Sequence, residues 1–325
     1  MTPQQPRPPF SPGSICLGLH VHSELPLDRM VSTLREQARA GEAAGFDGVT
    51  LSEHHAGFPS YAPNPLLWSA ILLGELEHAW AGPCPTLLPL RPAGGLIEDL
   101  AWLAAAYPGR VAAGFAAGYQ EQDFAALHSD FASRAQRYWE ALPQVVAALS
   151  GNADTVLRND PAIAALSTAP VSVVSGAGGP VGAQRAARAG AGLLITSLTD
   201  PRRARELVDA HGEAAATGGT SSTHVLIRRP WVGMRPGTLQ KNIEQYQSAG
   251  DNPSWLLQTD RDPLIAGDAA GIVDRIAGDA HQAGISALNL RVHLHGVAPE
   301  LVLEQIAELG RNVLPPLRAA LAQPV

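Results

Sequence analysis

Three adjacent ionisable side chains, Glu53, His54 and His55, follow a short apolar run from Val49 to Ser52. The imidazole group titrates near neutral pH, so His54 is suited to proton transfer, and Glu53 or His55 could orient its ring. A loop histidine is more often a surface or hydrogen-bonded side chain than a catalyst, and the residues alone leave that alternative open. The Gly- and Pro-rich segment from Ala56 to Pro63 indicates a loop that leaves a strand.

A glycine-rich turn is the second candidate site, and it stands between a β-branched run and a helical pattern. It comprises Ser175, Gly176, Ala177, Gly178 and Gly179. The backbone N–H groups of such a turn, together with the positive end of the following helix, can hold a phosphate. The turn lacks the strict dinucleotide-binding spacing, so a tight turn without a ligand is the alternative.

Two histidine pairs, His20/His22 and His293/His295, each place two imidazoles on one face of an extended segment. This spacing is compatible with metal binding, which makes a metal-dependent barrel hydrolase a further alternative. It is disfavoured because the only lysine is Lys241, in a predicted helix, and the last predicted strand carries no carboxylate. Histidines that face solvent or support other site residues are the favoured interpretation, and no metal ligand is predicted.

Alternating strands and helices supply the framework that must position these groups. Apolar, strand-like runs lie near residues 15, 49, 87, 112, 173, 194, 225 and 289, each followed by at least one helical pattern. Eight such units close a parallel barrel, whose reactive groups gather at the carboxyl ends of the strands. The expected fold is therefore α/β, a (β/α)8 TIM barrel with insertions, and an open doubly wound sheet is the alternative. Residues 1–13 predict a flexible leader, and residues 14–325 a single barrel domain.

Composition narrows the classes of partner and location. The chain has 325 residues, 46% of them hydrophobic, and a net charge of −7 with dispersed arginines, so no nucleic-acid partner is predicted. No apolar run approaches the roughly 18 to 20 residues of a membrane-spanning helix, and no signal-peptide pattern is present. Only two cysteines, Cys16 and Cys84, occur, both in apolar surroundings, so a reduced, cytoplasmic protein is expected.

Six motifs follow one another along nearly the whole chain: GFDGVTLSEHH, PNPLL, TLLPL, PGRVAAGFAAGYQEQDFAAL, SGAGGPVGAQRAARAGAG and GISALNLRVHLHG. In content and order they resemble the luciferase-like flavin-dependent monooxygenase family. The resemblance implies a TIM barrel, commonly a homodimer, that uses reduced FMN or the deazaflavin F420 to oxidise a small organic substrate. FMN is favoured over F420, and a separate flavin reductase is the partner that would supply reduced FMN.

The resemblance also implies roles for individual residues. His54 matches the histidine implicated in bacterial luciferase catalysis, which makes it the expected proton-transfer group beside the flavin. Cys84 and Pro85 fall where the family has a cis peptide under the flavin ring, and proline lowers the cost of that isomer, so a cis Cys84-Pro85 bond is predicted. Gly118 and Tyr119 match the turn after the fourth strand, which is a further expected cofactor contact.

The turn from Ser175 to Gly179 matches the family's phosphate turn but departs from it in charge. Ala117 stands where bacterial luciferase has an arginine, Gly94-Gly95 replaces a basic residue, and no hydroxyl follows Ser175. Each lost charge-assisted contact weakens anion binding by about 1.5 to 3 kcal/mol. A non-catalytic or cofactor-poor homologue is therefore the alternative to an enzyme. The candidates to replace these contacts are Arg91, Arg185 and Arg228.

Overall fold

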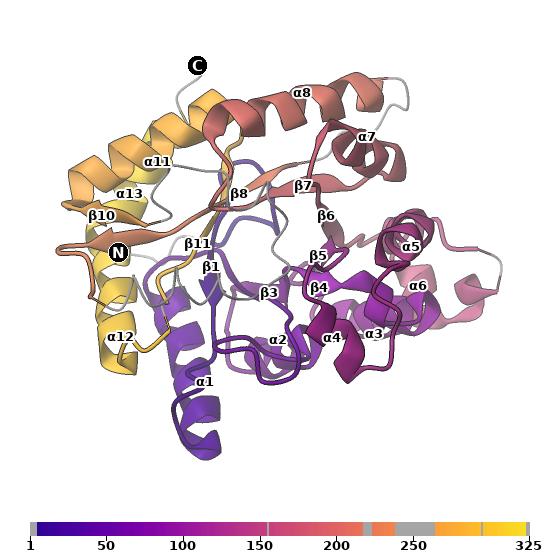
Figure 1. Cartoon of the computed structure of the whole chain (residues 1–325), viewed down its shortest axis with the longest axis horizontal. Helices are drawn as coiled ribbons and strands as arrows, with labels where there is room; N and C mark the ends of the chain where they lie inside the picture. Colours follow the sequence, from indigo (N-terminus) through magenta and orange to yellow (C-terminus); the bar gives the residue numbers. More distant parts are fainter. Residues whose placement is uncertain (1–4, 155, 217–222, 238–263, 294, 323–325) are drawn as a thin grey trace.

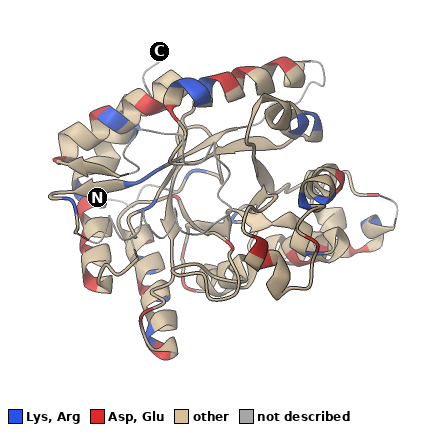
Figure 2. Cartoon of the chain, in the orientation of Figure 1, with Lys and Arg blue, Asp and Glu red and all other residues tan. Residues whose placement is uncertain are grey.

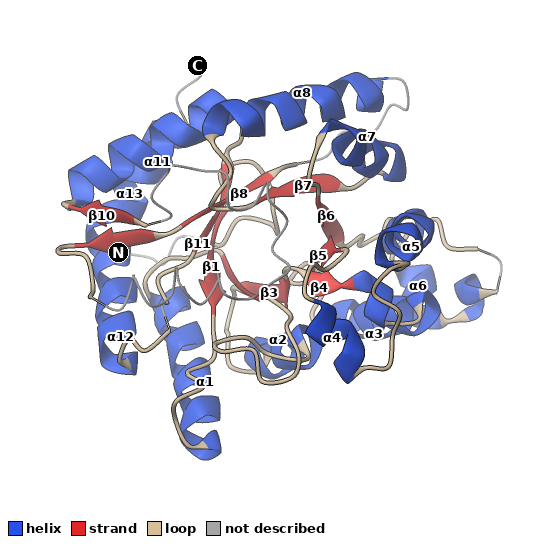
Figure 3. Ribbon diagram, in the orientation of Figure 1, coloured by secondary structure: helices blue, strands red, loops and turns tan. Residues whose placement is uncertain are grey.

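The computed structural model describes residues 5–154, 156–216, 223–237, 264–293 and 295–322. Within them a parallel sheet curls into a nearly closed barrel surrounded by helices (Figures 1 and 3). The barrel strands are β1 (Ile15–Leu19), β2 (Gly48–Leu51), β3 (Trp80–Pro83), β4 (Thr86–Leu87), β5 (Ala112–Ala116), β6 (Ser172–Gly176), β7 (Gly192–Ile195), β8 (Val225–Arg228) and β11 (Ala287–Leu290). Their order, β3-β2-β1-β11-β8-β7-β6-β5-β4, confirms the predicted TIM-barrel fold and rules out the doubly wound sheet.

Strands β3 and β4 are two parts of one barrel strand. β3 pairs with β2, whereas β4 pairs with β5, and the chain between them is Cys84-Pro85. The peptide bond between these two residues is cis, as predicted from the sequence. An isolated bridge between Ala81 and Val111 joins β3 to the segment that leads into β5 and brings the two edges of the sheet together. With β3 and β4 taken as one strand, the described residues form the eight barrel strands that the sequence predicts.

A shell of helices surrounds the strands, and most of these helices lie where the sequence places them. They are α1 (Leu27–Ala43), α2 (Pro65–Leu73), α3 (Ala93–Ala106), α4 (Glu121–Ala126), α5 (Arg134–Leu149), α6 (Pro161–Ala165), α7 (Pro180–Ala189), α8 (Pro201–Ala216), α11 (Ala269–Ala283), α12 (Pro299–Glu308) and α13 (Leu314–Leu321). Short α4 was not predicted, nor was the small parallel pair β9 (Pro230–Val232) and β10 (Ile265–Gly267). The predicted helix at 238–250 and the predicted loops at 217–222 and 252–262 lie outside the described residues.

Side-chain caps and left-handed glycines set several helix boundaries. The side chain of Asn64 accepts a hydrogen bond from the backbone N–H of Leu67 at 3.1 Å, which satisfies one free donor at the start of α2. Pro65 follows at the first helical position, where its missing N–H costs nothing. Helices α7 and α11 end at Gly190 and Gly284, whose φ angles of 83° and 69° are readily adopted only by glycine.

The N-terminal segment closes the lower end of the barrel, where the strands begin. The backbone N–H of Arg7 donates to Oδ1 of Asp47 at 2.9 Å. Phe10 is 1% exposed, and its ring meets Trp80 edge to face with centroids 5.2 Å apart. The sequence predicts a flexible leader over residues 1–13, and the structure instead packs residues 7–13 against the barrel. The cause is the apolar ring of Phe10, which has an open barrel end to fill.

Acidic and basic residues are interspersed along the outer helices (Figure 2). No helix in the described part of the chain is long and apolar enough to cross a membrane.

Candidate active site

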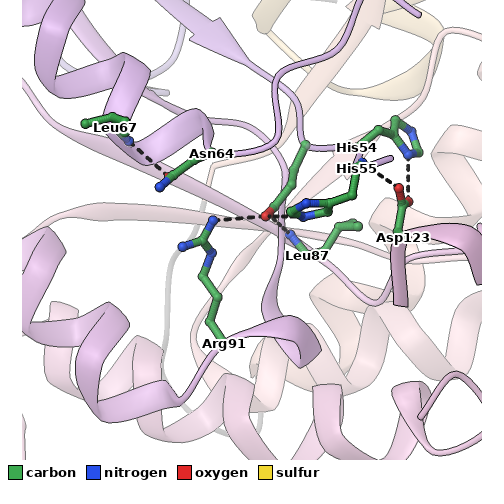
Figure 4. Close-up of polar contacts among 8 residues, drawn as sticks. His54, His55, Asn64, Leu67, Leu87, Arg91 and Asp123 are labelled. Carbon is green, nitrogen blue, oxygen red and sulfur yellow. Dashed lines mark hydrogen bonds and ion pairs between the residues drawn. The ribbon is translucent and has the colours of Figure 1, made fainter. Parts of the chain in front are cut away.

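His54 lies just beyond the carboxyl end of β2 and is held by a buried carboxylate. Its Nδ1 is 2.7 Å from Oδ2 of Asp123, a residue of α4 that is only 1% exposed (Figure 4). The other oxygen, Oδ1, accepts a hydrogen bond from the backbone N–H of His55 at 2.7 Å. Asp123 therefore fixes both the ring of His54 and the backbone that carries it. With Nδ1 donating to this carboxylate, Nε2 is the nitrogen that can take up a proton.

Aromatic side chains enclose the His54 ring. Phe58 stacks on it with centroids 4.3 Å apart, and Tyr61 meets it edge to face at 4.6 Å. The hydroxyl oxygen of Tyr119 lies 3.4 Å from Nε2 of His54. His54 is 6% exposed, so its ring lies in a site largely shielded from water. Shielding of this kind strengthens the electrostatic contacts of a general acid or base.

Glu53 and His55 bond each other and not the ring of His54. His55 Nε2 lies 2.9 Å from Oε1 of Glu53, which also accepts a hydrogen bond from Arg91 at 3.0 Å (Figure 4). The second oxygen of Glu53 accepts the backbone N–H of Leu87 at 2.7 Å. Glu53 thereby ties the loop that carries His54 to the chain beyond β4. The sequence led us to expect that Glu53 or His55 orients His54, and Asp123 takes that place.

Asp123 was missed because nothing local marks it. It lies within the motif that carries Gly118 and Tyr119, and it is separated from His54 by 69 positions along the chain. Its position at the start of a short helix after a barrel strand is the signal that could have pointed to it, because side chains from neighbouring βα loops converge at the same end of the barrel.

Four of the expected cofactor residues flank the paired strands β4 and β5: Cys84 and Pro85 directly precede β4, and Gly118 and Tyr119 follow β5. Gly118 adopts φ +82°, and a Cβ there would lie 2.8 Å from the ring of Phe124, so only glycine fits. Thr86 Oγ1 and Gln120 Nε2, one residue beyond Pro85 and Tyr119, are buried without a hydrogen-bond partner among the described residues. Buried polar atoms normally have partners, so these fit a polar ring-shaped cofactor that completes their bonding.

The surroundings of Cys84 disfavour its thiolate form. Burial raises the pKa of its thiol to about 12, so the reactive thiolate is scarce near neutral pH.

Ser175 contributes backbone rather than hydroxyl to the glycine-rich turn. It is fully buried, and its Oγ lies 2.6 Å from the hydroxyl of Tyr138, inside the barrel wall. Helix α7 begins at Pro180 with Gly179 as its N-cap and with no side-chain cap. The free N–H groups of this helix end, following Gly176, Ala177 and Gly178, fit an anionic group.

The three arginines considered for the phosphate have other partners. Arg91 pairs with Glu53, and Arg228 pairs with Asp279 through a 2.7 Å contact in which both side chains are nearly buried. The guanidinium of Arg185 lies 5.6 Å from the ring centre of Trp139. Arg203, at the start of α8, also borders the turn, because a Cβ on Gly179 would lie 3.7 Å from one of its terminal nitrogens. Its other terminal nitrogen lies 2.6 Å from Glu206, and both of these side chains are exposed. Arg203 has no local sequence signal, because α8 meets α7 only in the folded barrel.

Three of the four paired histidines are buried, and His295 is half-buried. His20, His22 and His293 are 4%, 1% and 3% exposed. His22 Nε2 lies 2.8 Å from the side-chain nitrogen of Gln37, and its Nδ1 is 3.1 Å from Glu24. Within the described residues, no group of three or more His, Cys, Asp or Glu side chains is arranged to hold a metal ion. The geometry therefore gives no support to a metal-dependent hydrolase.

The family described as luciferase-like monooxygenase matches residues 14–235, about two thirds of the chain. This chain belongs to that family. The sequence resemblance to luciferase-like proteins is thus confirmed, and the barrel is the fold that the resemblance implies.

Luciferase-like relatives of this protein include both F420 and FMN proteins. The F420-dependent glucose-6-phosphate dehydrogenase of Tsukamurella paurometabola is 30% identical over 200 residues, which span 57% of this chain and 60% of that protein. An F420-dependent secondary alcohol dehydrogenase in complex with an F420-acetone adduct has a TM-score of 0.72 at 17% identity, covering 96% of this chain and 100% of that chain. The FMN-bound oxygenating constituent of 3,6-diketocamphane monooxygenase from Pseudomonas putida has a TM-score of 0.70 at 14% identity, covering 93% and 98%.

Proposed function

We propose that this luciferase-like protein is an oxidoreductase that uses reduced FMN, or F420 in its place, to act on a small organic substrate. The observation that carries the proposal is the buried pair of His54 and Asp123 at the barrel mouth, 2.7 Å apart and enclosed by aromatic rings. A histidine whose Nδ1 is held by a carboxylate is a common general acid or base. His54 also lies beside Tyr119, one of the expected cofactor residues, so it is placed to transfer a proton in a reaction at the cofactor.

Each part of the site has a role in this proposal. The bound cofactor supplies the hydride or oxygen chemistry. Pro85 and Gly118 would lie beside its ring, and the turn from Ser175 to Gly179 would hold its phosphate through backbone N–H groups. Nε2 of His54 takes up or delivers a proton while Asp123 holds the opposite nitrogen in place. Glu53 and His55 keep the loop in register, so they act by positioning His54.

FMN remains the favoured cofactor, and F420 is the second candidate. The 30% identical F420-dependent relative supports F420. The net charge of −7 supports FMN, because the long anionic tail of F420 favours a basic entrance. In the FMN version, a separate flavin reductase supplies the reduced cofactor. A cytosolic location suits either version and agrees with the two buried, free cysteines.

A cofactor-poor homologue is the second candidate function. It is favoured by the phosphate turn, where Ala117 offers no charge and the Ser175 hydroxyl is taken by Tyr138. Arg203 stands against it, because that guanidinium borders the turn at Gly179.

Titration of the purified protein with FMN, reduced FMN and F420 tests these candidates. We expect saturable binding of at least one of them, measured by fluorescence and by calorimetry under anaerobic conditions. Riboflavin serves as the matched ligand without a phosphate, and FMN should bind more than tenfold more tightly, because only FMN can use Arg203 and the backbone N–H groups of the turn. Absence of binding to all three cofactors at high micromolar concentration would establish the cofactor-poor homologue instead.

An Arg203→Ala variant tests how the phosphate is held. We expect it to weaken FMN binding by about tenfold or more, the effect of one charge-assisted contact, and to leave riboflavin binding unchanged. Arg202→Ala is the matched control, because that neighbouring side chain is 81% exposed. Equal losses for FMN and riboflavin would show that Arg203 supports the fold rather than the phosphate.

We propose that the protein forms a homodimer through the face of α1 and α2. An ion pair joins Arg35 of α1 to Glu75 just after α2, so the two helices lie side by side. Leu27 lies eight positions before Arg35, and Leu67 lies eight positions before Glu75, on helices that run in the same direction. Leu27 is 77% exposed and Leu67 is 57% exposed. Adjoining them are Val31 and Ile71, each 37% exposed. Four exposed apolar side chains on two neighbouring helices suit an association surface.

A Leu67→Glu variant is expected to shift the protein from dimer to monomer, because it buries a charge in the proposed interface. Sedimentation equilibrium measures the mass. Leu301→Glu, at a position that is 45% exposed on α12, is the control and should leave the dimer intact. A wild-type monomer at high micromolar concentration, or a dimer unaffected by Leu67→Glu, would contradict this interface.

A further inference from the structure

A second cluster of buried side chains lies at the barrel mouth between β1 and β11. The register pairs Leu17 with Leu290, and His20 and His293 each follow three residues later, so the two histidines come side by side. Their rings stack with centroids 5.5 Å apart and an interplanar angle of 16°. Both are almost completely buried.

The ring nitrogens of this cluster are short of partners. Neither ring nitrogen of His20 makes a hydrogen bond of normal geometry among the described residues, although the nearby Gly18 backbone partly offsets the lowering of its pKa. His293 Nε2 lies 3.2 Å from the hydroxyl of Ser60, and its Nδ1 has no partner in the same part of the structure. Polar atoms buried without partners are costly, so three of them in one place indicate that a bound group completes their bonding.

Positive charge surrounds the cluster. Burial lowers the pKa of His20 well below its usual value, and the guanidinium groups of Arg291 and Arg229 lower it further. Arg291 is 6% exposed and donates to the Ser52 hydroxyl at 3.1 Å. Neutral imidazole N–H groups in the field of two guanidiniums suit a ligand that accepts hydrogen bonds and carries negative charge.

We propose that His20 and His293 form an oxyanion subsite, in which they donate hydrogen bonds to a carboxylate or phosphate group in the field of Arg291 and Arg229. That the anion belongs to a substrate rests on the proposed function. The anion site itself does not depend on a cofactor.

Tyr61 connects the subsite to the proposed proton-transfer group. Its ring meets the His20 ring edge to face at 5.1 Å and the His54 ring at 4.6 Å. One tyrosine ring therefore separates the anion from His54. The substrate class that fits is a small organic acid or phosphate ester whose reacting carbon lies a few bonds from its charge.

Side-chain NMR of 15N-histidine-labelled protein, without cofactor, tests the subsite. Sulfate is the first probe, because its charge stays constant over the working range of roughly pH 6 to pH 8. We expect a saturable shift of the His20 nitrogens. Acetate and inorganic phosphate, titrated separately, distinguish a carboxylate site from a phosphate site.

Variants supply the assignment and the control. His20→Phe keeps an aromatic ring, removes both nitrogens, and is expected to weaken sulfate binding by about tenfold or more, the effect of one charge-assisted hydrogen bond. His20→Asn provides the assignment if His20→Phe does not fold. His78→Phe, at an exposed loop histidine, should bind sulfate as the wild type does.

Two results would overturn the subsite. One is a His20 signal that none of the three anions moves, which would mean that water completes the ring bonding. The other is unchanged sulfate affinity in His20→Phe. Since no cofactor is present in this titration, a protein that binds no flavin or F420 but shows the His20 shift would lose the proposed oxidoreductase function and keep the anion site.

Discussion

Replacement of His54 by alanine is expected to lower kcat by about 10² to 10⁴-fold, the usual contribution of a general acid or base. The cofactor affinity should stay near that of the wild type, because His54 is bonded to Asp123 and enclosed by aromatic rings rather than placed in the phosphate turn. Turnover is measured with a substrate found by screening the wild type with reduced FMN and oxygen and with F420. His78→Ala is the control, because that histidine is exposed and lies in a loop before β3.

Asp123→Asn extends this prediction to the carboxylate. An amide in place of the carboxylate can either accept or donate a hydrogen bond, so it no longer fixes which nitrogen of His54 carries the proton. We therefore expect kcat to fall below that of the control variant but less than it falls in His54→Ala. If Asp123 acts through His54, the double variant should be no slower than His54→Ala, since residues that act as a unit are not additive. Turnover of His54→Ala within twofold of the wild type would exclude the proton-transfer role.

The barrel could be predicted because each strand carries its own signal. Buried strands of a parallel sheet are continuous apolar runs, so the run from Val171 to Val174 indicates β6 without reference to any other part of the chain. The N-terminal segment was predicted less well. Its prolines and polar residues indicate a flexible leader, and the burial of Phe10 depends on the open lower end of a barrel that only the whole fold creates.

The site was predicted in its location but not in its connections. Glu53, His54 and His55 lie together in sequence, yet successive side chains of an extended segment point to opposite sides. Glu53 and His55 therefore share one side and bond each other, while His54 faces the other side and meets Asp123. The alternation of side chains along the extended segment explains the contact between Glu53 and His55 from the sequence alone. The second depends on how the β2 and β5 loops meet, and no local pattern contains that information.

The arginine that borders the phosphate turn also could not be predicted from the local sequence. Arg91 and Arg228 were candidates because of their charge, and each is held by a carboxylate elsewhere. Arg203 reaches the turn because α7 and α8 pack against each other, so its relevance is a property of the packed helices and not of the residues around it.

Replacement of Glu53 by alanine is expected to lower stability far more than it alters chemistry. Its buried carboxylate accepts hydrogen bonds from Arg91 and from the Leu87 backbone, and it bonds His55. Removing one partner of a buried ion pair costs about 3 kcal/mol, the lower end of the usual range because Arg91 can still reach water. The measurement is the free energy of unfolding in urea. Glu53→Gln should recover part of the loss, because its amide oxygen can still accept the Leu87 N–H.

Asp209→Ala is the matched control, because Asp209 also pairs with an arginine, Arg205, but both side chains are exposed on the outer surface of α8. Exposed pairs contribute little, so its loss of stability should be clearly smaller than that of Glu53→Ala.

The two possible roles of Glu53, positioning and catalysis, predict opposite results. A positioning role predicts a lower unfolding free energy. Turnover per folded molecule should then fall only to the extent that the loop carrying His54 is displaced. A catalytic role predicts wild-type stability with turnover as low as in His54→Ala, and that pattern would show that Glu53 itself takes part in the reaction.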